Sequence, residues 1–477
     1  MKTHSLLESL TLTAAAVLSS AILSAPGRAC GEYASRDAVR LSTVTTKPVL
    51  LAGQNTVTHL KVGLTGFELA AHRQRIPLNL AIVLDRSGSM IGEKLARAKE
   101  AAQLMVQGLR DDDIVSVVIY DGDVHVIVPS TKATSRDEIC AKLAAVRGGS
   151  DTALFAGVSK GAEEARKFAT TDRVNRIILL SDGLANVGPS SPSELADFGA
   201  SLAKEGLAVT TIGLGAGYNE DLMTQLAARS DGRHAFIERP AELASLFRDE
   251  LGMMMAVVAQ RVSVEITCDP GVKPMRVLGR PAVIAGSRVT VDLNHLYAGE
   301  EKYIVLEVEV PATGPDVTRD LARVAARFEN LYTKATENLT GLVSARFSSS
   351  REEVEKSINR EAMVAAVTQI ATAENERATA LRDAGRSTEA KAVLLGNADY
   401  LGDNGRKYQV QSLRDFEEIN RQDARNLDEL DWSVARKLMK DVQFNNGQSQ
   451  GKDIDKAARR RMVIPPQSAV PAGSTRP

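Results

Sequence analysis

In the stretch Leu78-Asn79-Leu80-Ala81-Ile82-Val83-Leu84-Asp85-Arg86-Ser87-Gly88-Ser89-Met90, a continuous apolar run changes abruptly to polar residues. An apolar run without alternation predicts a strand that is buried on both faces of a parallel sheet. The residues that follow predict a helix, because their apolar side chains recur every three or four positions: Leu95, Ala98, Ala102, Met105 and Leu109. Asp85, Ser87 and Ser89 would then lie at the carboxyl end of a central strand, where open α/β sheets bind their ligands.

This polar loop offers one carboxylate and two hydroxyl oxygens. Mg²⁺ prefers oxygen ligands and usually keeps several waters, so a protein site supplies only one or two carboxylates. Hydroxyl ligands are neutral and would leave the ion with a net positive charge, which would attract an anionic ligand group. The loop alone is not specific, because serine-rich turns beside an aspartate are common and most are only turns.

Two later stretches make the pattern specific. Gly148-Gly149-Ser150-Asp151-Thr152-Ala153-Leu154 places a threonine just after a glycine pair, and Ile177-Ile178-Leu179-Leu180-Ser181-Asp182-Gly183 is a second buried strand that ends in an aspartate. In this order and separation, the three stretches resemble the von Willebrand factor A domain and its metal-ion-dependent adhesion site. The resemblance covers roughly residues 76 to 255.

The resemblance implies a set of metal ligands, which are Asp85, Ser87, Ser89, Thr152 and Asp182. Ser150 is the alternative to Thr152, but the spacing to Gly157 favours Thr152. The implied ion is Mg²⁺, with Mn²⁺ or Ca²⁺ as alternatives, and the implied ligand is a protein partner with an exposed carboxylate. A domain that kept the turn without binding metal is the competing interpretation.

The flanking segments predict the rest of the architecture. Residues 30–75 and 258–349 are strand-rich and each is short for a stable sandwich, so we expect one β-sandwich domain built from both segments. The predicted fold class is therefore α/β, with a Rossmann-like doubly wound domain (residues 76–257) inserted in a β-sandwich and followed by an α-helical region (residues 350–443). In that region we expect a helix stop at Gly385 and a single helical stretch from Tyr408 to about Met439. Residues 444–477 are rich in Gly, Ser, Gln and Pro, which predicts a disordered tail.

The amino terminus predicts export. Residues 1–29 resemble a signal peptide, with Lys2 before a moderately apolar segment and small residues near a cleavage site. The protein would then be periplasmic or extracellular, with membrane contact only through an N-terminal anchor. Lipid attachment at Cys30 is the minority interpretation, because Gly27 and Arg28 are unusual before a lipidated cysteine. Cys140 and Cys268 could pair, but they fall in different predicted domains, and unpaired thiols are the simpler expectation.

Other function classes find little support in the sequence. The charges nearly balance, with 59 Lys plus Arg against 60 Asp plus Glu, so no overall field favours nucleic acid. Gly213-Leu214-Gly215-Ala216-Gly217 lacks the third glycine of a dinucleotide fingerprint, which argues against nucleotide binding. No histidine has a partner at metal-ligand spacing, and no general base is visible near the predicted metal loops.

These observations predict a non-enzymatic, metal-dependent binding or adhesion module of the cell envelope. Beyond the central domain, the arrangement is similar to bacterial secreted proteins related to inter-alpha-trypsin inhibitor heavy chains and calcium-activated chloride channel regulators. One alternative is a metal-dependent hydrolase, because a magnesium site can polarise a phosphoryl oxygen. The other alternative is an envelope assembly scaffold whose metal site is only structural.

Overall fold

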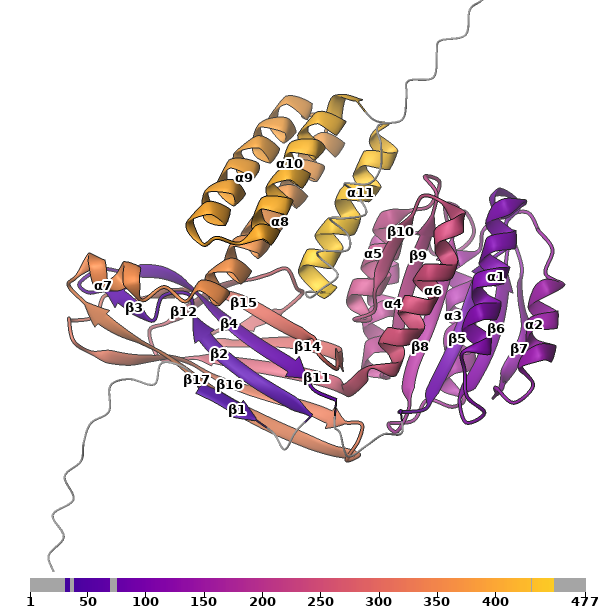
Figure 1. Cartoon of the computed structure of the whole chain (residues 1–477), viewed down its shortest axis with the longest axis horizontal. Helices are drawn as coiled ribbons and strands as arrows, with labels where there is room; N and C mark the ends of the chain where they lie inside the picture. Colours follow the sequence, from indigo (N-terminus) through magenta and orange to yellow (C-terminus); the bar gives the residue numbers. More distant parts are fainter. Residues whose placement is uncertain (1–30, 35–37, 69–74, 430, 450–477) are drawn as a thin grey trace, which may run out of the picture.

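The computed structural model of the protein describes residues 31–34, 38–68, 75–429 and 431–449. The predictions for residues 1–29 and for Cys30 lie outside the described residues. The chain forms an α/β domain, a β-sandwich and a group of C-terminal helices, and the helices lie next to both other parts (Figure 1).

The α/β domain contains a six-stranded sheet in the order β10-β9-β8-β5-β6-β7, in which only the β6–β7 pair is antiparallel. Every residue of β5, β6, β8 and β9 is buried, as the uninterrupted apolar runs predicted for β5 and β8. The strands are β5 (Leu78–Asp85), β6 (Ile114–Tyr120), β7 (Val124–Lys132), β8 (Val174–Ser181), β9 (Ala208–Leu214) and β10 (His234–Ile237).

Helices cover both faces of this sheet. Leu80 and Ile82 of β5 pack against one layer, formed by α1 (Glu93–Gln107), α2 (Arg136–Ala144) and α6 (Leu243–Met255). Ala81 and Val83 pack against the other layer, formed by α3 (Leu154–Arg166), α4 (Pro192–Lys204) and α5 (Glu220–Arg229). The doubly wound α/β prediction is therefore confirmed. Helix α2 was not predicted, because only Ile139 and Leu143 of its residues are buried and the apolar period is weak.

The sandwich is built from both flanks of the α/β domain. Its sheets have the orders β1-β2-β4-β15-β12 and β13-β14-β11-β16-β17-β3, so each combines strands from before and after the insertion. The early strands are β1 (Gly31–Ala34), β2 (Val39–Thr45), β3 (Val49–Leu51) and β4 (Thr56–Gly66). The later strands are β11 (Val257–Cys268), β12 (Lys273–Leu278), β13 (Val283–Ala285), β14 (Arg288–Tyr297), β15 (Glu301–Val310), β16 (Thr318–Asn330) and β17 (Ala335–Ser348). Apolar side chains of both sheets share one core, so the predicted insertion into a β-sandwich is confirmed.

The C-terminal region is helical, but two predictions for it were wrong. Its helices are α7 (Arg351–Lys356), α8 (Arg360–Asp383), α9 (Ser387–Lys407), α10 (Gln411–Glu429) and α11 (Trp432–Phe444). Gly385 has φ +77° between α8 and α9, as expected for a helix stop. The single helix expected from Tyr408 to Met439 is in fact two, because Asp431 caps α11 by accepting a hydrogen bond from the Ser433 N–H at 2.8 Å.

The tail predicted from residue 444 is also ordered at its start. Phe444 ends α11, and a short π-helical turn, η3, covers Asn445–Ser449. Gln369 Nε2 donates to the Asn446 carbonyl at 2.7 Å, and Gln448 Nε2 donates to the Gly279 carbonyl at 3.2 Å. The polar residues that suggested disorder therefore form hydrogen bonds with the helices and with the sandwich. The remainder of the predicted tail, residues 450–477, is outside the described part of the chain.

Helix α11 fastens the C-terminal helices to the α/β domain. It lies beside α5 and the edge strand β10 (Figure 1). Arg436 pairs with Glu220 at 2.5 Å and Asp221 at 2.8 Å, both in the first turn of α5, and the Phe236 N–H of β10 donates to Asp441. An edge strand is thereby covered. None of the helices in the ranges described is long and apolar enough to cross a membrane.

Candidate metal centre

Asp85, the last residue of β5, is fixed by hydrogen bonds at the carboxyl edge of the sheet. Its side chain is completely buried. Oδ1 accepts from the Ser87 N–H at 2.8 Å, and Oδ2 accepts from Ser181 Oγ at 2.7 Å and from the Tyr120 hydroxyl at 3.4 Å. Burial raises the pKa of Asp85 above its usual range, and hydrogen bonds from Ser87 and Ser181 oppose that rise.

The hydroxyls of the same loop connect Asp85 to the end of β8. Ser87 Oγ lies 3.2 Å from Ser89 Oγ, and Ser89 Oγ donates to Asp182 Oδ1 at 2.6 Å. Asp182 directly follows β8, the neighbour of β5 in the sheet, and is buried, whereas Ser89 is exposed. Parallel strands end at the same edge, which is why two aspartates 97 positions apart in the sequence converge.

The third predicted stretch joins this edge through its backbone. The Gly88 N–H donates to the Ser150 carbonyl at 2.8 Å, and the Gly149 N–H donates to the Arg86 carbonyl at 2.6 Å. A Cβ built on Gly183 would lie 3.1 Å from Thr152 Oγ1 and 3.5 Å from Ser89 Oγ, so both hydroxyls face the same small space. The structure thus brings all five predicted residues together: Asp85, Ser87, Ser89, Thr152 and Asp182. Ser150 Oγ lies instead towards Gly122, at 3.8 Å from a Cβ built there.

Two basic residues near the cluster have contacts that the sequence did not reveal. Lys94, in the first turn of α1, places Nζ 2.5 Å from Asp182 Oδ2. Arg86, inside the first metal loop, is mostly buried and pairs with Asp121 at 2.9 Å. Lys94 could have been found from its position, because the first turn of the helix after a metal loop lies at the same edge of the sheet.

The donor set of this cluster suits a hard divalent cation. It consists of two carboxylates and three hydroxyls, all of them oxygen donors. Across the chain as described, no three His, Cys, Asp or Glu side chains gather closely enough to hold a metal, so an ion at this edge would depend on the hydroxyls. Asp85, Ser87, Ser89, Thr152 and Asp182 are the residues that could hold it, and the ion would supply positive charge at the solvent-facing side of Ser89.

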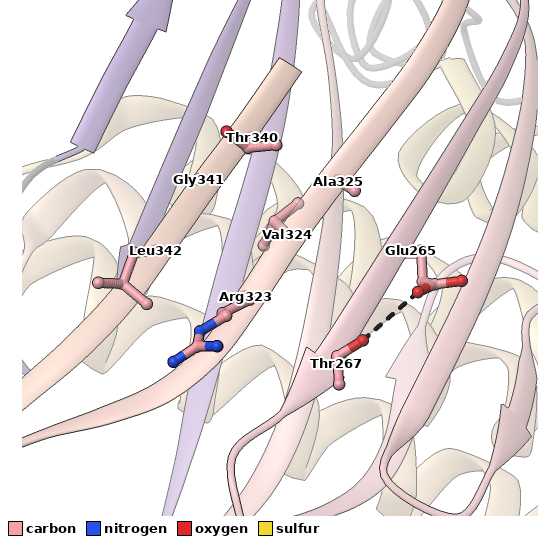
Figure 2. Close-up of a pocket in the computed structure, with 8 residues that line it drawn as sticks. All are labelled: Glu265, Thr267, Arg323, Val324, Ala325, Thr340, Gly341 and Leu342. Atoms are coloured by element: carbon pink, nitrogen blue, oxygen red, sulfur yellow. Dashed lines mark hydrogen bonds between the residues drawn. The ribbon is translucent and has the colours of Figure 1, made fainter. Parts of the chain in front are cut away.

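The other candidates from the sequence do not form comparable sites. His234 and His295 are buried, and Cys140 and Cys268 are free thiols. A hollow of about 340 Å³ lies on the outer face of the sandwich, over β11, β16 and β17. Figure 2 shows the residues that line it, which include one acid and one base, Glu265 and Arg323, beside two threonines and small or apolar residues, and none of the five predicted residues.

Comparisons with known proteins agree with this geometry. Residues 79–249 match the family model of the von Willebrand factor type A domain. The chain is 29% identical over 254 residues to the uncharacterized protein YfbK of Escherichia coli (strain K12), covering 52% of this chain and 44% of that one. It is 26% identical over 180 residues to human inter-alpha-trypsin inhibitor heavy chain H3, covering 35% and 20%. The chain therefore spans less than half the length of either relative.

A solved structure extends the likeness beyond the α/β domain. The von Willebrand factor type A structure from Catenulispora acidiphila superimposes with a TM-score of 0.65 at 18% identity, covering 80% of this chain and 91% of that chain. At this identity the match concerns the fold alone. Its coverage exceeds the α/β domain, so the likeness includes flanking parts of the chain.

Proposed function

We propose, on the premise that residues 79–249 form a von Willebrand factor type A domain, that this chain binds a protein partner through a divalent ion held by Asp85, Ser87, Ser89, Thr152 and Asp182. Such domains are typically metal-dependent protein-interaction modules. A carboxylate of the partner completes the ion's coordination. The observation that carries the proposal is the convergence of these oxygen donors at one sheet edge, with Ser89 open to solvent.

The surface around the oxygen cluster favours a protein ligand over a small hydrophilic anion. Ile91, one position after the first metal loop, is 63% exposed. Leu184 and Val187, just after Asp182, are 62% and 40% exposed. Covering solvent-exposed aliphatic side chains with a partner removes apolar surface from water and therefore favours binding. We therefore place Ile91, Leu184 and Val187 in the interface and call them the aliphatic rim.

The same site gives less support to a hydrolase. Hydrolysis at a metal requires a nucleophile or a general base close to the ion. The nearby Ser181 and Tyr120 hydroxyls are buried and donate to Asp85, and no histidine in the described ranges is hydrogen-bonded to the cluster. A phosphatase and esterase screen with added Mg²⁺ discriminates the two functions, and turnover that Asp85→Asn abolishes would favour the hydrolase.

We further propose that the protein acts outside the cytoplasm. The support is the signal-like character of residues 1–29, whose cleavage would leave Cys30 as the first residue. Mass spectrometry of the mature protein purified from its host tests this directly. A mature chain that starts near residue 30 is expected, and a chain that retains residues 1–29 would contradict export by cleavage.

Metal binding is the first test of the proposed site. Isothermal titration with Mg²⁺ and Mn²⁺ should detect one site in the wild type and none in Asp85→Asn. The change preserves the shape of a buried side chain and removes its charge. Asp172→Asn is the matched control, because Asp172 lies in the loop before β8, away from the carboxyl edge, and should leave titration unchanged. Equal titration of wild type and Asp85→Asn would overturn the site.

Partner binding is the second test. A photo-crosslinking amino acid at Ile91 should capture a defined protein in the host when Mg²⁺ is present. Capture should be lost with chelator and in the Asp85→Asn background, because the partner's carboxylate then has no ion to bind. Equal capture under all three conditions would reject metal-dependent binding, even if the metal site itself were confirmed.

A further inference from the structure

Lys94 brings a positive charge into the candidate metal centre. It lies in the first turn of α1, with Nζ 2.5 Å from Asp182 Oδ2, and its side chain is 33% exposed. A Cβ built on Gly215, just after β9, would lie 3.6 Å from the same Nζ. The ammonium group therefore sits between the ends of β8 and β9, at the edge where the oxygen donors gather.

The contact divides the oxygens of Asp182 between two partners. Oδ1 accepts from Ser89 Oγ at 2.6 Å, and Oδ2 accepts from Lys94 Nζ. A carboxylate held at both oxygens has a fixed orientation, which matters because groups behind a metal's direct ligands orient them. Lys94 is thus placed to present one oxygen of Asp182 to the cluster while neutralising the charge of the other.

The charges of the cluster can be counted from these contacts. Asp85 and Asp182 contribute two negative charges, which a divalent ion would cancel. Arg86 and Asp121 form a neutral pair. Lys94 then leaves the ion-loaded centre with an excess of one positive charge. Without Lys94 the ion-loaded centre would be neutral, and its electrostatic attraction for an anion would be weaker.

We propose that Lys94 is a selectivity-determining residue, which keeps the ion-loaded centre cationic, so that the centre prefers a carboxylate ligand over a neutral one. This inference rests on the proposed metal-dependent function. It makes a prediction that a purely structural role for Lys94 does not make, because removing its charge should affect the cation and the anion in opposite directions. The ion gains affinity when a like charge is removed, whereas the carboxylate loses affinity.

The test compares Lys94→Met and Lys94→Arg with Arg97→Met. Arg97 lies one turn later on α1 and pairs with the exposed Glu93 and Glu100, so it controls for loss of a surface cation. Titration with Mn²⁺ alone measures metal affinity. Broadening of the NMR lines of a capped Leu-Glu-Leu tripeptide by protein-bound Mn²⁺ measures carboxylate binding, and Leu-Gln-Leu serves as the neutral probe.

Lys94→Met should bind Mn²⁺ about threefold to tenfold more tightly and the Glu peptide about tenfold more weakly, with its preference over the Gln peptide reduced. Lys94→Arg should keep the preference, and Arg97→Met should resemble wild type. A parallel loss of Mn²⁺ and peptide affinity in Lys94→Met would reduce Lys94 to a structural role, and an unchanged Glu preference would also overturn the inference. Absence of Mn²⁺ binding by wild type is a different result, because it overturns the proposed function itself.

Discussion

In the six-stranded sheet, the parallel strands begin at one side, the amino edge, and end at the other, the carboxyl edge. Both edges contain buried carboxylates, but different parts of the protein cover them. At the amino edge, Asp231 lies just before β10 and is buried under the sandwich. Lys302 of β15 donates to Asp231 at 2.7 Å, the His295 N–H of β14 donates at 3.2 Å, and Arg280 lies at 3.5 Å. At the carboxyl edge, Asp85 and Asp182 have Lys94 as their cation, and Ser89 faces solvent.

The difference lies in where the neutralising charge comes from. The sandwich supplies two cations to one carboxylate, and burial lowers the pKa values of Lys302 and Arg280 while Asp231 opposes that change. Such a closed cluster holds two domains together. The carboxyl edge has two carboxylates, one lysine and three hydroxyls, of which only that of Ser89 is exposed. On the proposed function, a divalent ion from solution completes its charge balance. The comparison indicates that the burial of a carboxylate alone does not favour a ligand site, and that it is the shortage of cations at the carboxyl edge that favours an ion there.

The largest effect on stability should come from breaking the closed cluster at the amino edge, which we call the closed edge. Asp231→Asn leaves Lys302 and Arg280 buried without their carboxylate, and the loss should be about 3–5 kcal/mol of unfolding free energy. Asparagine suits the position because Asp231 has φ +50°, a conformation that asparagine tolerates. Urea denaturation measures the loss. The surface change Asp428→Asn, which removes the exposed pair with Lys391, should cost less than about 1 kcal/mol.

The carboxyl edge, which we call the open edge, should instead stabilise the protein when it binds its ion. At a Mg²⁺ concentration one hundred times its dissociation constant, wild type should gain about 2.7 kcal/mol of stability by mass action. Asp85→Asn should gain nothing, while Asp231→Asn should keep the full increment on its lower baseline. Thermal unfolding with Mg²⁺ or chelator measures these differences. If Asp231→Asn also lost the increment, the two edges would not be independent and the comparison would fail.

The open edge was largely predictable from sequence, and the closed edge was not. Asp85 ends a recognisable buried strand, and Ser87, Ser89 and Asp182 closely follow one. The rule that parallel strands end together brings these residues to one place. Asp231 and Lys302 are 71 positions apart, in different domains, and neither belongs to a local motif. Lys94 falls between these cases, because its helix was predicted but its contact with Asp182 depends on how α1 packs against the sheet.

The same reasoning accounts for the errors in the C-terminal region. Composition predicted a disordered tail from residue 444, whereas Asn446 is buried and bonded to Gln369 of α8. A polar residue with buried partners cannot be distinguished by composition from one in solvent. The break between α10 and α11 was missed for a related reason, because Asp431 resembles an ordinary helical surface residue until its capping hydrogen bond is seen.

Acidification should destabilise the protein through two buried histidines, His295 at the closed edge and His234 of β10, whose pKa burial lowers to about 3. Burial, with Arg176 and Lys302 nearby, holds the pKa of His295 well below its ordinary value. Below about pH 6.5 the unfolded chain therefore binds a proton at His295 that the folded chain does not. The contribution of this histidine to the free energy of unfolding should decrease by about 1.4 kcal/mol for each unit by which the pH is lowered. His295→Gln should reduce this slope in urea titrations at about pH 5 to 7. An unchanged slope would mean that His295 takes up its proton in the folded state.

The smallest effect on stability should come from the aliphatic rim of the open edge. Leu184 is mostly exposed, so Leu184→Ser should change the unfolding free energy by less than about 0.5 kcal/mol. Its cost should appear in partner binding, as a roughly threefold to tenfold loss of the Mg²⁺-dependent crosslinking from Ile91, because covering part of a leucine side chain is worth about 1 kcal/mol.

Leu342→Ser is the matched control for the rim. Leu342 is an exposed leucine in the hollow of Figure 2, on the outer face of the sandwich. It should leave both stability and crosslinking nearly unchanged, because an exposed leucine contributes to affinity only where the partner covers it. If Leu342→Ser weakened crosslinking from Ile91 and Leu184→Ser did not, the main contacts of the partner would lie on the sandwich. Leu184 would then be outside the interface, and Ile91 would only border it.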